Sequence, residues 1–512
     1  MRLTRRLFGA VSMLCLVALA GGVQAAEPKR GGTLNVIVDL EPASMDPIFG
    51  NAPGSDRRFF NLFAENLISQ DVSGNMQPAL AESWAWSEDG KSITFKLRPG
   101  VVFHDGTPFD AEAVKFNFDR VSDPQVGARA LQYVGNLAST EVIDPLTVKV
   151  NLKEPSAAFL ATVIAVEPGM IVSPTAVKSM GADFARKPVG TGPFKVVAWT
   201  SGNLETERFD RYWKKDAAGQ SLPYVDKVVA RVVSNTAVKL AELKGNGAQL
   251  GDTIQVKDFE QVERDGNLVL VDNNQGPTQY VSFNNTKPPF DNVELRKAVT
   301  FGINRAAIEK AVSRGQGTVL MGLEAPTSWA SGPELKGHPY DPEAAKAAYA
   351  KSGHKGPITL SVIQRDPDTQ IAQLIQAMLK QVGIELKIEV MERQAWVEKT
   401  LSYNTEMGIL RATMPRPDPD LSFSTYYGKE AKQDYSGIKS PYLWETVAKA
   451  RTELDQNVRR KLYIDMQNYI LDNYYQTFLF WRPTKEVARK SLQGFNREFS
   501  GAWVYSGMWL DS

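Results

Sequence analysis

A strand–helix–strand pattern in the C-terminal half constrains the fold of this 512-residue chain most strongly. Apolar and polar residues alternate over 358–362 and again over 384–390, which is the period-2 pattern of a strand with one buried face. Between these segments, 371–382 carries apolar side chains at helical spacing, and Gly383 is placed to end that helix in the left-handed conformation. Strands joined in this way run parallel with a right-handed crossover. The sequence therefore predicts an α/β fold.

A second pattern, in the first third of the chain, predicts a β-hairpin that leads into a helix. Apolar and polar residues alternate over 93–98, Pro99-Gly100 can turn the chain, and 101–103 can form a second short strand. Asp110 is then placed to cap a helix through its side-chain oxygen. The buried face of that helix would carry Val114, Phe118 and Val121. The segment carries structure and no catalytic chemistry.

The first 25 residues are typical of an export signal. A basic start is followed by an apolar stretch over 7–19, which is too short to cross a bilayer. Residues 23–25 (VQA) offer signal peptidase small side chains at the −3 and −1 positions, so we expect the mature chain to begin at Ala26. An uncleaved membrane anchor is the alternative. The adjacent Arg5 and Arg6 also fit the twin-arginine export route.

Composition excludes several classes of protein. Signal cleavage would remove three of the 59 basic residues and leave 56 against 58 acidic ones, a net charge of −2 with the histidines neutral. Such a balance gives no electrostatic footprint for nucleic acid or an anionic membrane. The only cysteine, Cys15, lies in the apolar stretch of the signal and lacks the small residue before it that lipidation requires. We therefore expect a soluble periplasmic protein without disulfides, long enough for about three domain-sized units.

Short motifs follow one another along the chain in a fixed order. The first two are 78–84 (PALAESW) and 95–109 (FKLRPGVVFHDGTPF), and 188–194 (PVGTGPF) comes next. Residues 283–285 (FNN) then precede 293–305 (VELRKAVTFGINR). In this order the motifs resemble those of the family 5 extracellular solute-binding proteins, the peptide/nickel class that serves ABC importers.

The resemblance implies a two-lobed periplasmic binding protein fold, a Venus-flytrap with an extra subdomain. Such a protein would capture a peptide or peptide-like small solute between its lobes and deliver it to an inner-membrane ABC permease. It would work as a monomer, without a cofactor and without nucleic acid. The implied segments are the signal peptide at 1–25, lobe I at 26–66, 190–285 and 482–512, the inserted subdomain at 67–189, and lobe II at 286–481.

An exported glycoside hydrolase is the alternative from another class. The aspartates of 366–368 and 418–420 could serve as paired acid and base, yet each pair flanks a proline, and Asp-Pro is common in turns. The three histidines show no H-E-x-x-H spacing, and neither a G-x-S-x-G elbow nor a phosphate-binding glycine loop occurs. We therefore predict no catalytic residue and no metal site.

The resemblance also implies where the ligand binds. Peptide-binding members place an aspartate three residues before the D-P-D stretch, where it pairs with the ligand's α-ammonium. This position is Pro415 here, so the amine anchor is either missing or has passed to Asp418 or Asp420. Arg365 roughly matches an arginine that holds the ligand carboxylate, a task that suits the bidentate guanidinium. Trp396 matches a tryptophan that contacts ligand in oligopeptide binders.

Further candidates come from the same part of the sequence, namely Arg393, Arg416 and, before the presumed hinge, Tyr280. The alternatives are core packing for the aromatic residues and a solvated surface for the arginines. A cleft that keeps arginines and lacks an amine-binding aspartate favours a solute with an anionic group, because an unpaired ammonium is costly to desolvate. A non-peptide anionic solute or a sugar remains the alternative to a peptide.

Overall fold

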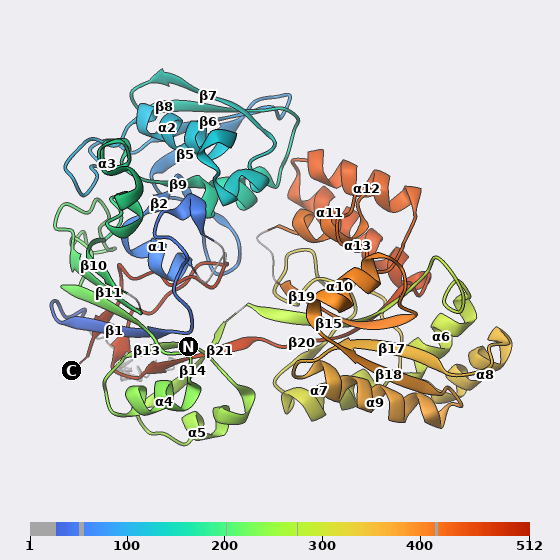
Figure 1. The fold of residues 1–512 in the computed structure, drawn as a ribbon. Helices are drawn as coiled ribbons and strands as arrows, with labels where there is room; N and C mark the ends of the chain where they lie inside the picture. The colour runs from blue at the N-terminus through green and yellow to red at the C-terminus, as the bar shows by residue number, and fades with distance from the viewer. Residues whose placement is uncertain (1–26, 51–55, 201, 274, 415–417, 512) are drawn as a thin grey trace, which may run out of the picture.

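The computed structural model describes residues 27–511 except 51–55, 201, 274 and 415–417. Two large mixed sheets lie side by side, each with its own helices, and a smaller sheet stands above the first (Figure 1). Over this described part of the chain, no helix is both long and apolar enough to span a membrane.

The first large sheet has seven strands and is built around β1. Side chains of β1 enter a core cluster on either face, because Leu34 and Val36 pack on one side and Ile37 on the other. The helices α4 (Thr236–Lys244) and α5 (Phe259–Glu263) cover the second face. In spatial order the strands are β10 (Phe194–Thr200), β11 (Asn203–Arg208), β12 (Lys227–Val232), β1 (Thr33–Val38), β13 (Leu250–Ile254), β21 (Thr484–Arg489) and β14 (Leu268–Asn273).

The smaller sheet confirms the predicted strand over 93–98 and the capped helix, but the predicted hairpin does not form, because this strand pairs with β5 and β8. The helix α2 (Ala111–Ser122) begins where Asp110 Oδ1 accepts a hydrogen bond from the Ala113 amide at 2.9 Å. The second strand predicted over 101–103 is wrong, because the tight turn leaves only one bridge, between Val102 and Pro108. The strands of this antiparallel sheet are β5 (Ala81–Trp86), β6 (Ser92–Leu97), β8 (Thr147–Leu152) and β7 (Leu137–Asp144).

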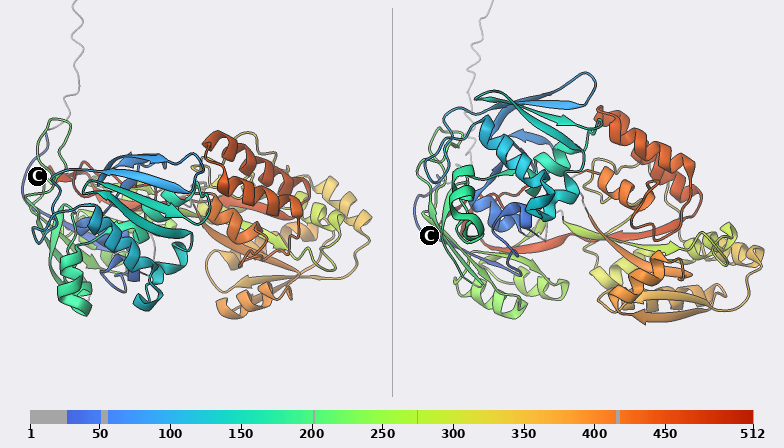
Figure 2. Two further views of the ribbon diagram at one scale, coloured as in Figure 1. Left: turned by 90° about the horizontal axis from the view of Figure 1, so that it is seen from above. Right: turned by 45° about the horizontal axis from the view of Figure 1, so that its top comes forward.

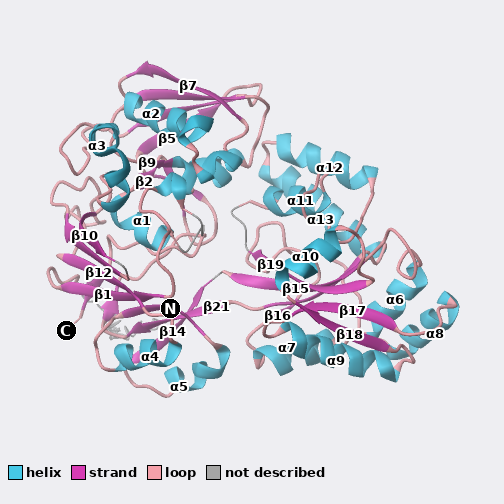
Figure 3. Ribbon diagram, in the orientation of Figure 1, coloured by secondary structure: helices cyan, strands magenta, loops and turns pink. Residues whose placement is uncertain are grey.

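The second large sheet has six strands between two layers of helices (Figure 3). The predicted strand–helix–strand unit is confirmed, since β17 and β18 pair in parallel and Gly383 has a φ of 88°. One layer is α6 (Val293–Gly302), α7 (Arg305–Ser313), α8 (Pro342–Ser352) and α9 (Asp368–Gln381); the other is α10 (Arg393–Leu401), α11 (Asp420–Tyr427), α12 (Pro441–Thr452) and α13 (Gln456–Asp472). The strands are β16 (Thr318–Val319), β20 (Gln476–Trp481), β15 (Gly276–Phe283), β19 (Met407–Met414), β17 (Ile358–Ile363) and β18 (Leu386–Met391).

Shorter elements complete the molecule. They are the helices α1 (Arg57–Phe63) and α3 (Pro174–Met180) and the strand pairs β2 (Glu65–Asn66) with β9 (Met170–Ile171), β3 (Ile68–Gln70) with β4 (Met76–Pro78), and β22 (Leu492–Gln493) with β23 (Trp509–Leu510). The predicted division into lobes remains a prediction. That division assigned β15 to lobe I, whereas β15 pairs within the six-stranded sheet.

Two described segments lie where the chain passes between the large sheets, and we call residues 273, 275–278 and 481–484 the crossing pair. They run antiparallel, because β14 pairs with β21 on one side and β15 with β20 on the other. The Thr484 amide donates to the Gln275 carbonyl at 2.9 Å between these two ladders. Backbone pairing therefore continues from one sheet into the other.

The sheets are also in contact on the side away from the crossing pair. Loops of the four-stranded sheet come up against the end of α12 (Figure 2). The Ala157 amide donates to the Arg451 carbonyl at 3.1 Å, and a Cβ added at Gly90 would lie 3.5 Å from the Leu454 Cδ1. The space between the sheets is thus bounded by protein contacts at two places.

A substitution at Gly276 tests how closely the two segments of the crossing pair approach each other. A Cβ at this position would lie 2.0 Å from the carbonyl oxygen of Arg482, so the backbone would have to move. We expect Gly276→Ala to lower the free energy of unfolding by about 1–3 kcal/mol, measured by chemical denaturation. The control is Gly135→Ala, where nothing lies within 4 Å of the added Cβ. A loss of stability no larger than that of the control would contradict this packing.

Candidate functional site

A cavity of about 300 Å³ lies where the two large sheets meet. It stands at the carboxyl ends of β1 and β13, the position at which open α/β sheets bind their ligands. Its volume is at the lower end of the range for small-molecule sites. The crossing pair forms one wall, and Arg411 of β19 enters from the six-stranded sheet. The other lining side chains that matter for its charge are Asp39, Arg58 and Asp252.

A group of arginines gathers at this edge of the six-stranded sheet, and we call Arg365, Arg393, Arg411 and Arg482 the arginine cluster. Arg411 is exposed by its surface area, yet partial desolvation lowers its pKa, and the positive charges of the other three arginines lower it further. Among the described residues, Asp368 is the one carboxylate that forms an ion pair with an arginine of the cluster. Its Oδ2 accepts from Arg365 Nε at 2.6 Å. The excess of positive charge favours an anionic ligand.

The facing wall, on the seven-stranded sheet, carries a network of paired charges. Lys239 is fully buried and donates to Asp39 Oδ1 at 2.6 Å and to Asp252 Oδ1. Arg58 lies 3.4 Å from Asp252 Oδ2 and 3.0 Å from Glu486 Oε1. Burial raises the pKa of Asp252 to about 6 in spite of these two cations. On this wall, unlike the opposite one, positive and negative charges are matched.

The predicted aromatic contacts lie in the core of the second large sheet. Trp396 is 3% exposed and donates from Nε1 to the Ser361 carbonyl at 3.1 Å. Tyr280 is 2% exposed, and its ring centroid lies 5.9 Å from that of Phe478. Burial raises the pKa of Tyr280 well above its usual value. Both positions match the core-packing alternative, and a ligand contact by either residue stays a prediction.

The two aspartates proposed as substitute amine anchors already have partners. Asp418 is buried, and Arg459 of α13 donates to its two oxygens at 2.8 and 2.6 Å. Asp420 accepts from Ser424 Oγ at 2.9 Å and lies 3.4 Å from Arg451, and burial raises its pKa. Sequence reasoning missed Arg459, because its partner is 41 residues away and no local pattern links them.

The remaining predicted residues differ in how far the structure describes them. Arg393 is exposed at the start of α10. Arg365 is partly buried, and its pairing with Asp368 uses only Nε among the described contacts. Pro415 and Arg416 lie outside the described residues. Among the residues that the structure describes, no group of three or more His, Cys, Asp or Glu side chains is arranged to hold a metal ion.

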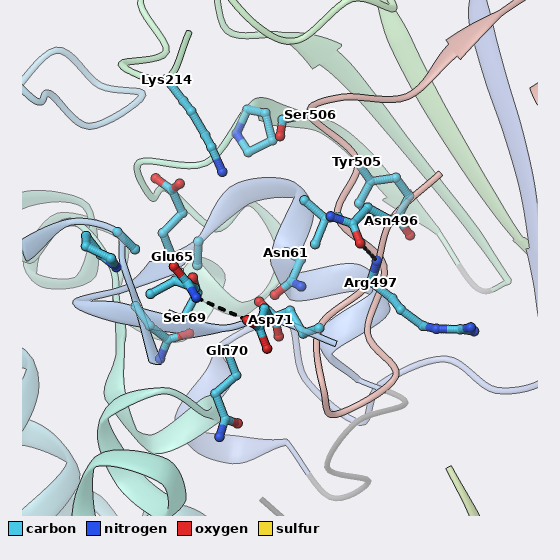
Figure 4. Close-up of a pocket in the computed structure, with 18 of the residues that line it drawn as sticks. Asn61, Glu65, Ser69, Gln70, Asp71, Lys214, Asn496, Arg497, Tyr505 and Ser506 are labelled. Carbon is cyan, nitrogen blue, oxygen red and sulfur yellow. Dashed lines mark hydrogen bonds between the residues drawn. The ribbon is translucent and has the colours of Figure 1, made fainter. Parts of the chain in front are cut away.

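A second, larger cavity of about 430 Å³ lies within the first sheet's part of the molecule (Figure 4). Polar side chains surround it, including Gln70, Asp71 and Arg497. Its buried acid, Glu65, accepts from Tyr212 Oη at 2.8 Å, Trp213 Nε1 at 2.9 Å and Thr191 Oγ1 at 2.9 Å. Because Tyr212 and Trp213 of the cavity wall, together with Thr191, already satisfy this acid, we take the cavity between the sheets as the candidate site.

Two α/β sheets joined by a crossing pair, with a charged cavity between them, define a solute-binding protein. The model of the bacterial extracellular solute-binding proteins, family 5 Middle, matches residues 75–434, and the chain belongs to this family. It is 31% identical to the glutathione-binding protein GsiB of Salmonella paratyphi A, over 96% of either chain. The chain therefore binds a solute for an ABC importer and is not an enzyme, which removes the support for the hydrolase alternative.

Solved structures share the fold. DppA from Helicobacter pylori in complex with the peptide STSA is 26% identical, with a TM-score of 0.74 over 94% of this chain and 99% of that one. HbpA2 from Haemophilus parasuis is 23% identical, with a TM-score of 0.85 over 94% of this chain and 100% of that one. The predicted two-lobed periplasmic binding protein fold is confirmed.

The buried pair of Asp418 and Arg459 generates a prediction about stability. Asp418→Ala would leave Arg459 with an uncompensated buried charge, so the free energy of unfolding should fall by about 3–5 kcal/mol in a denaturation experiment. The control is Asp465→Ala, which removes a carboxylate from an exposed pair with Lys461 on the same helix and should cost less than about 1 kcal/mol. Similar losses for the two variants would argue against a structural role for Asp418.

Proposed function

We propose that this protein is the periplasmic substrate-binding component of an ABC importer for a peptide or peptide-like solute with carboxylate groups. The solute binds between the two lobes, and the lobes close on it by bending at the crossing pair. The closed, monomeric protein then delivers the solute to an inner-membrane permease. Lobe I holds the seven-stranded sheet and 482–512, the inserted subdomain holds 67–189, and lobe II holds 286–481 together with β15, which the division predicted from the sequence had assigned to lobe I through residue 285.

The arginine cluster is the observation that carries the ligand class. Four guanidinium groups with one described carboxylate partner leave an excess of positive charge at the edge of the cavity. Guanidinium binds carboxylate through two parallel hydrogen bonds, which supplies both energy and orientation. A neutral sugar can accept hydrogen bonds from these arginines but leaves their charge uncompensated, whereas a non-peptide anion would compensate it.

Relatives of this chain support a peptide-like solute. One is named as a glutathione-binding protein, and one solved structure holds the peptide STSA. Glutathione is a tripeptide with two carboxylates and one free ammonium near neutral pH, so it matches a cavity rich in arginine. It is therefore the first ligand to test, beside ordinary di- and tripeptides.

Arg411 provides the test of the ligand class, because it lines the cavity and no described residue accepts a hydrogen bond from its guanidinium. We expect Arg411→Ala to weaken the binding of glutathione or the tightest peptide by about 1.5–3 kcal/mol in calorimetric titration. The control is Arg264→Ala, which removes an arginine that is 77% exposed. Saturating ligand should also lower the radius of gyration in small-angle scattering.

Two results would reject this function. If a neutral sugar binds more tightly than any carboxylate solute, and Arg411→Ala leaves that affinity unchanged, the ligand is not an anion. If scattering curves with and without saturating ligand are identical, the lobes do not close.

Export generates a further prediction. Residues 23–25 (VQA) fit signal peptidase, so intact-mass measurement of periplasmic material should give a chain that begins at Ala26 and carries no lipid. A chain that retains Cys15 with added acyl mass would show that the protein is a lipoprotein instead.

A further inference from the structure

Of the two described carboxylates that line the cavity between the sheets, Asp39 and Asp252, only that of Asp39 has an oxygen without a described donor. This residue follows β1 directly, and its side chain is 40% exposed. Its Oδ1 accepts from Lys239, whereas no described residue donates to Oδ2. The carboxylates of Asp252 and Asp418, by contrast, have donors at both oxygens. Asp39 therefore differs from Asp252, the other carboxylate that lines the cavity, in having acceptor capacity left for a ligand.

The fold holds this carboxylate in place through Lys239. The ammonium of Lys239 is fully buried and has three acceptors, one for each N–H: Asp39 Oδ1, Asp252 Oδ1 and the Thr253 carbonyl at 3.2 Å. The Asp39 amide also donates to Asp252 Oδ2 at 2.6 Å. The backbone and the side chain of Asp39 are thus both hydrogen-bonded to the buried pair of Lys239 and Asp252. A carboxylate held in this way loses little freedom when it binds a ligand.

Charge in the same cavity is complementary to a ligand with two opposite charges. Arg58 donates from its two terminal nitrogens to Asp252 and Glu486. Among the charged side chains that line the cavity, the groups left for a ligand are therefore the Asp39 Oδ2 and the Arg411 guanidinium. One open acceptor and one open donor in a single cavity match a free ammonium and an anionic group. Burying both charges of such a solute is favourable only when each finds a partner.

We propose that Asp39 is the amine anchor of this protein and that Arg411 holds an anionic group of the same solute. The ligand class is a peptide or amino-acid derivative with a free ammonium, which includes glutathione. The inference rests on the proposed function and deepens it. It assigns the amine contact to the first sheet rather than to Asp418 or Asp420.

The test compares free and blocked amines on wild type and on Asp39→Asn. Asparagine keeps the size of the side chain and the acceptor for Lys239 but removes the charge. Asp39→Asn should weaken the binding of glutathione, or of the tightest free-amine peptide, about tenfold or more in calorimetric titration. The N-acetylated form of the same ligand should bind wild type more weakly and should bind Asp39→Asn no worse than wild type.

A matched control keeps the result specific. Asp272 is an exposed carboxylate on β14 of the same sheet. It is paired with Lys485 and does not line the cavity, so Asp272→Asn should leave affinity within about twofold. Chemical denaturation of each variant shows whether it is folded. If Asp39→Asn is unstable, Asp39→Glu on the folded protein should retain the preference for a free amine over its acetylated form.

The outcomes separate this inference from the proposed function. Equal loss of free and acetylated ligand on Asp39→Asn, or no loss of either, overturns the amine anchor and leaves the carboxylate-binding function intact. If no free-amine peptide binds wild type and an acetylated or amine-free anion does, the anchor is overturned while Arg411 keeps its role. If only uncharged solutes bind, both proposals fail.

Discussion

The crossing pair is the constraint on which the rest of the molecule depends. Its two segments extend the hydrogen-bonded ladders of both large sheets, so the sheets are joined by paired backbone rather than by single loose linkers. The absence of a side chain at Gly276 allows the segments to approach closely. In the proposed closure, bending at this pair would change the distance between the sheets, and the cavity lies directly beside it.

The two walls of the cavity differ in their balance of charge. On the seven-stranded sheet, a fully buried lysine and a largely buried arginine are matched with three acids, because an uncompensated charge in that environment is costly. On the six-stranded sheet, the arginine cluster lies nearer to solvent and keeps an excess of charge. An anionic ligand would neutralise the excess positive charge of the arginine cluster and leave the ion pairs of the first wall intact. This difference makes the second wall the natural place for carboxylate recognition.

Local patterns in the sequence were enough to predict the strand–helix–strand unit and the capped helix α2, because their periodicity and capping residues lie within one short segment. The strand expected over 101–103 failed, since apolar composition cannot tell a single bridge from a ladder. The partners of the buried charges could not be predicted from the sequence. Lys239 meets Asp39 across 200 residues and Arg459 meets Asp418 across 41, and only the packed fold brings them together. The sequence identified Arg365 as a candidate ligand contact but did not predict its hydrogen bond to Asp368.

The same contacts explain why an acid in the D-P-D stretch is a poor amine anchor here. Arg459 engages the two oxygens of Asp418, so an incoming ammonium would have to displace a buried guanidinium or share its partner. Leaving that guanidinium unpaired costs about 3–5 kcal/mol, which exceeds the gain from one charge-assisted hydrogen bond. Asp39 requires no such exchange, because Lys239 occupies one oxygen and leaves the other open to the cavity. Loss of the aspartate at Pro415 is therefore compatible with a free-amine ligand whose ammonium is bound by the opposite sheet.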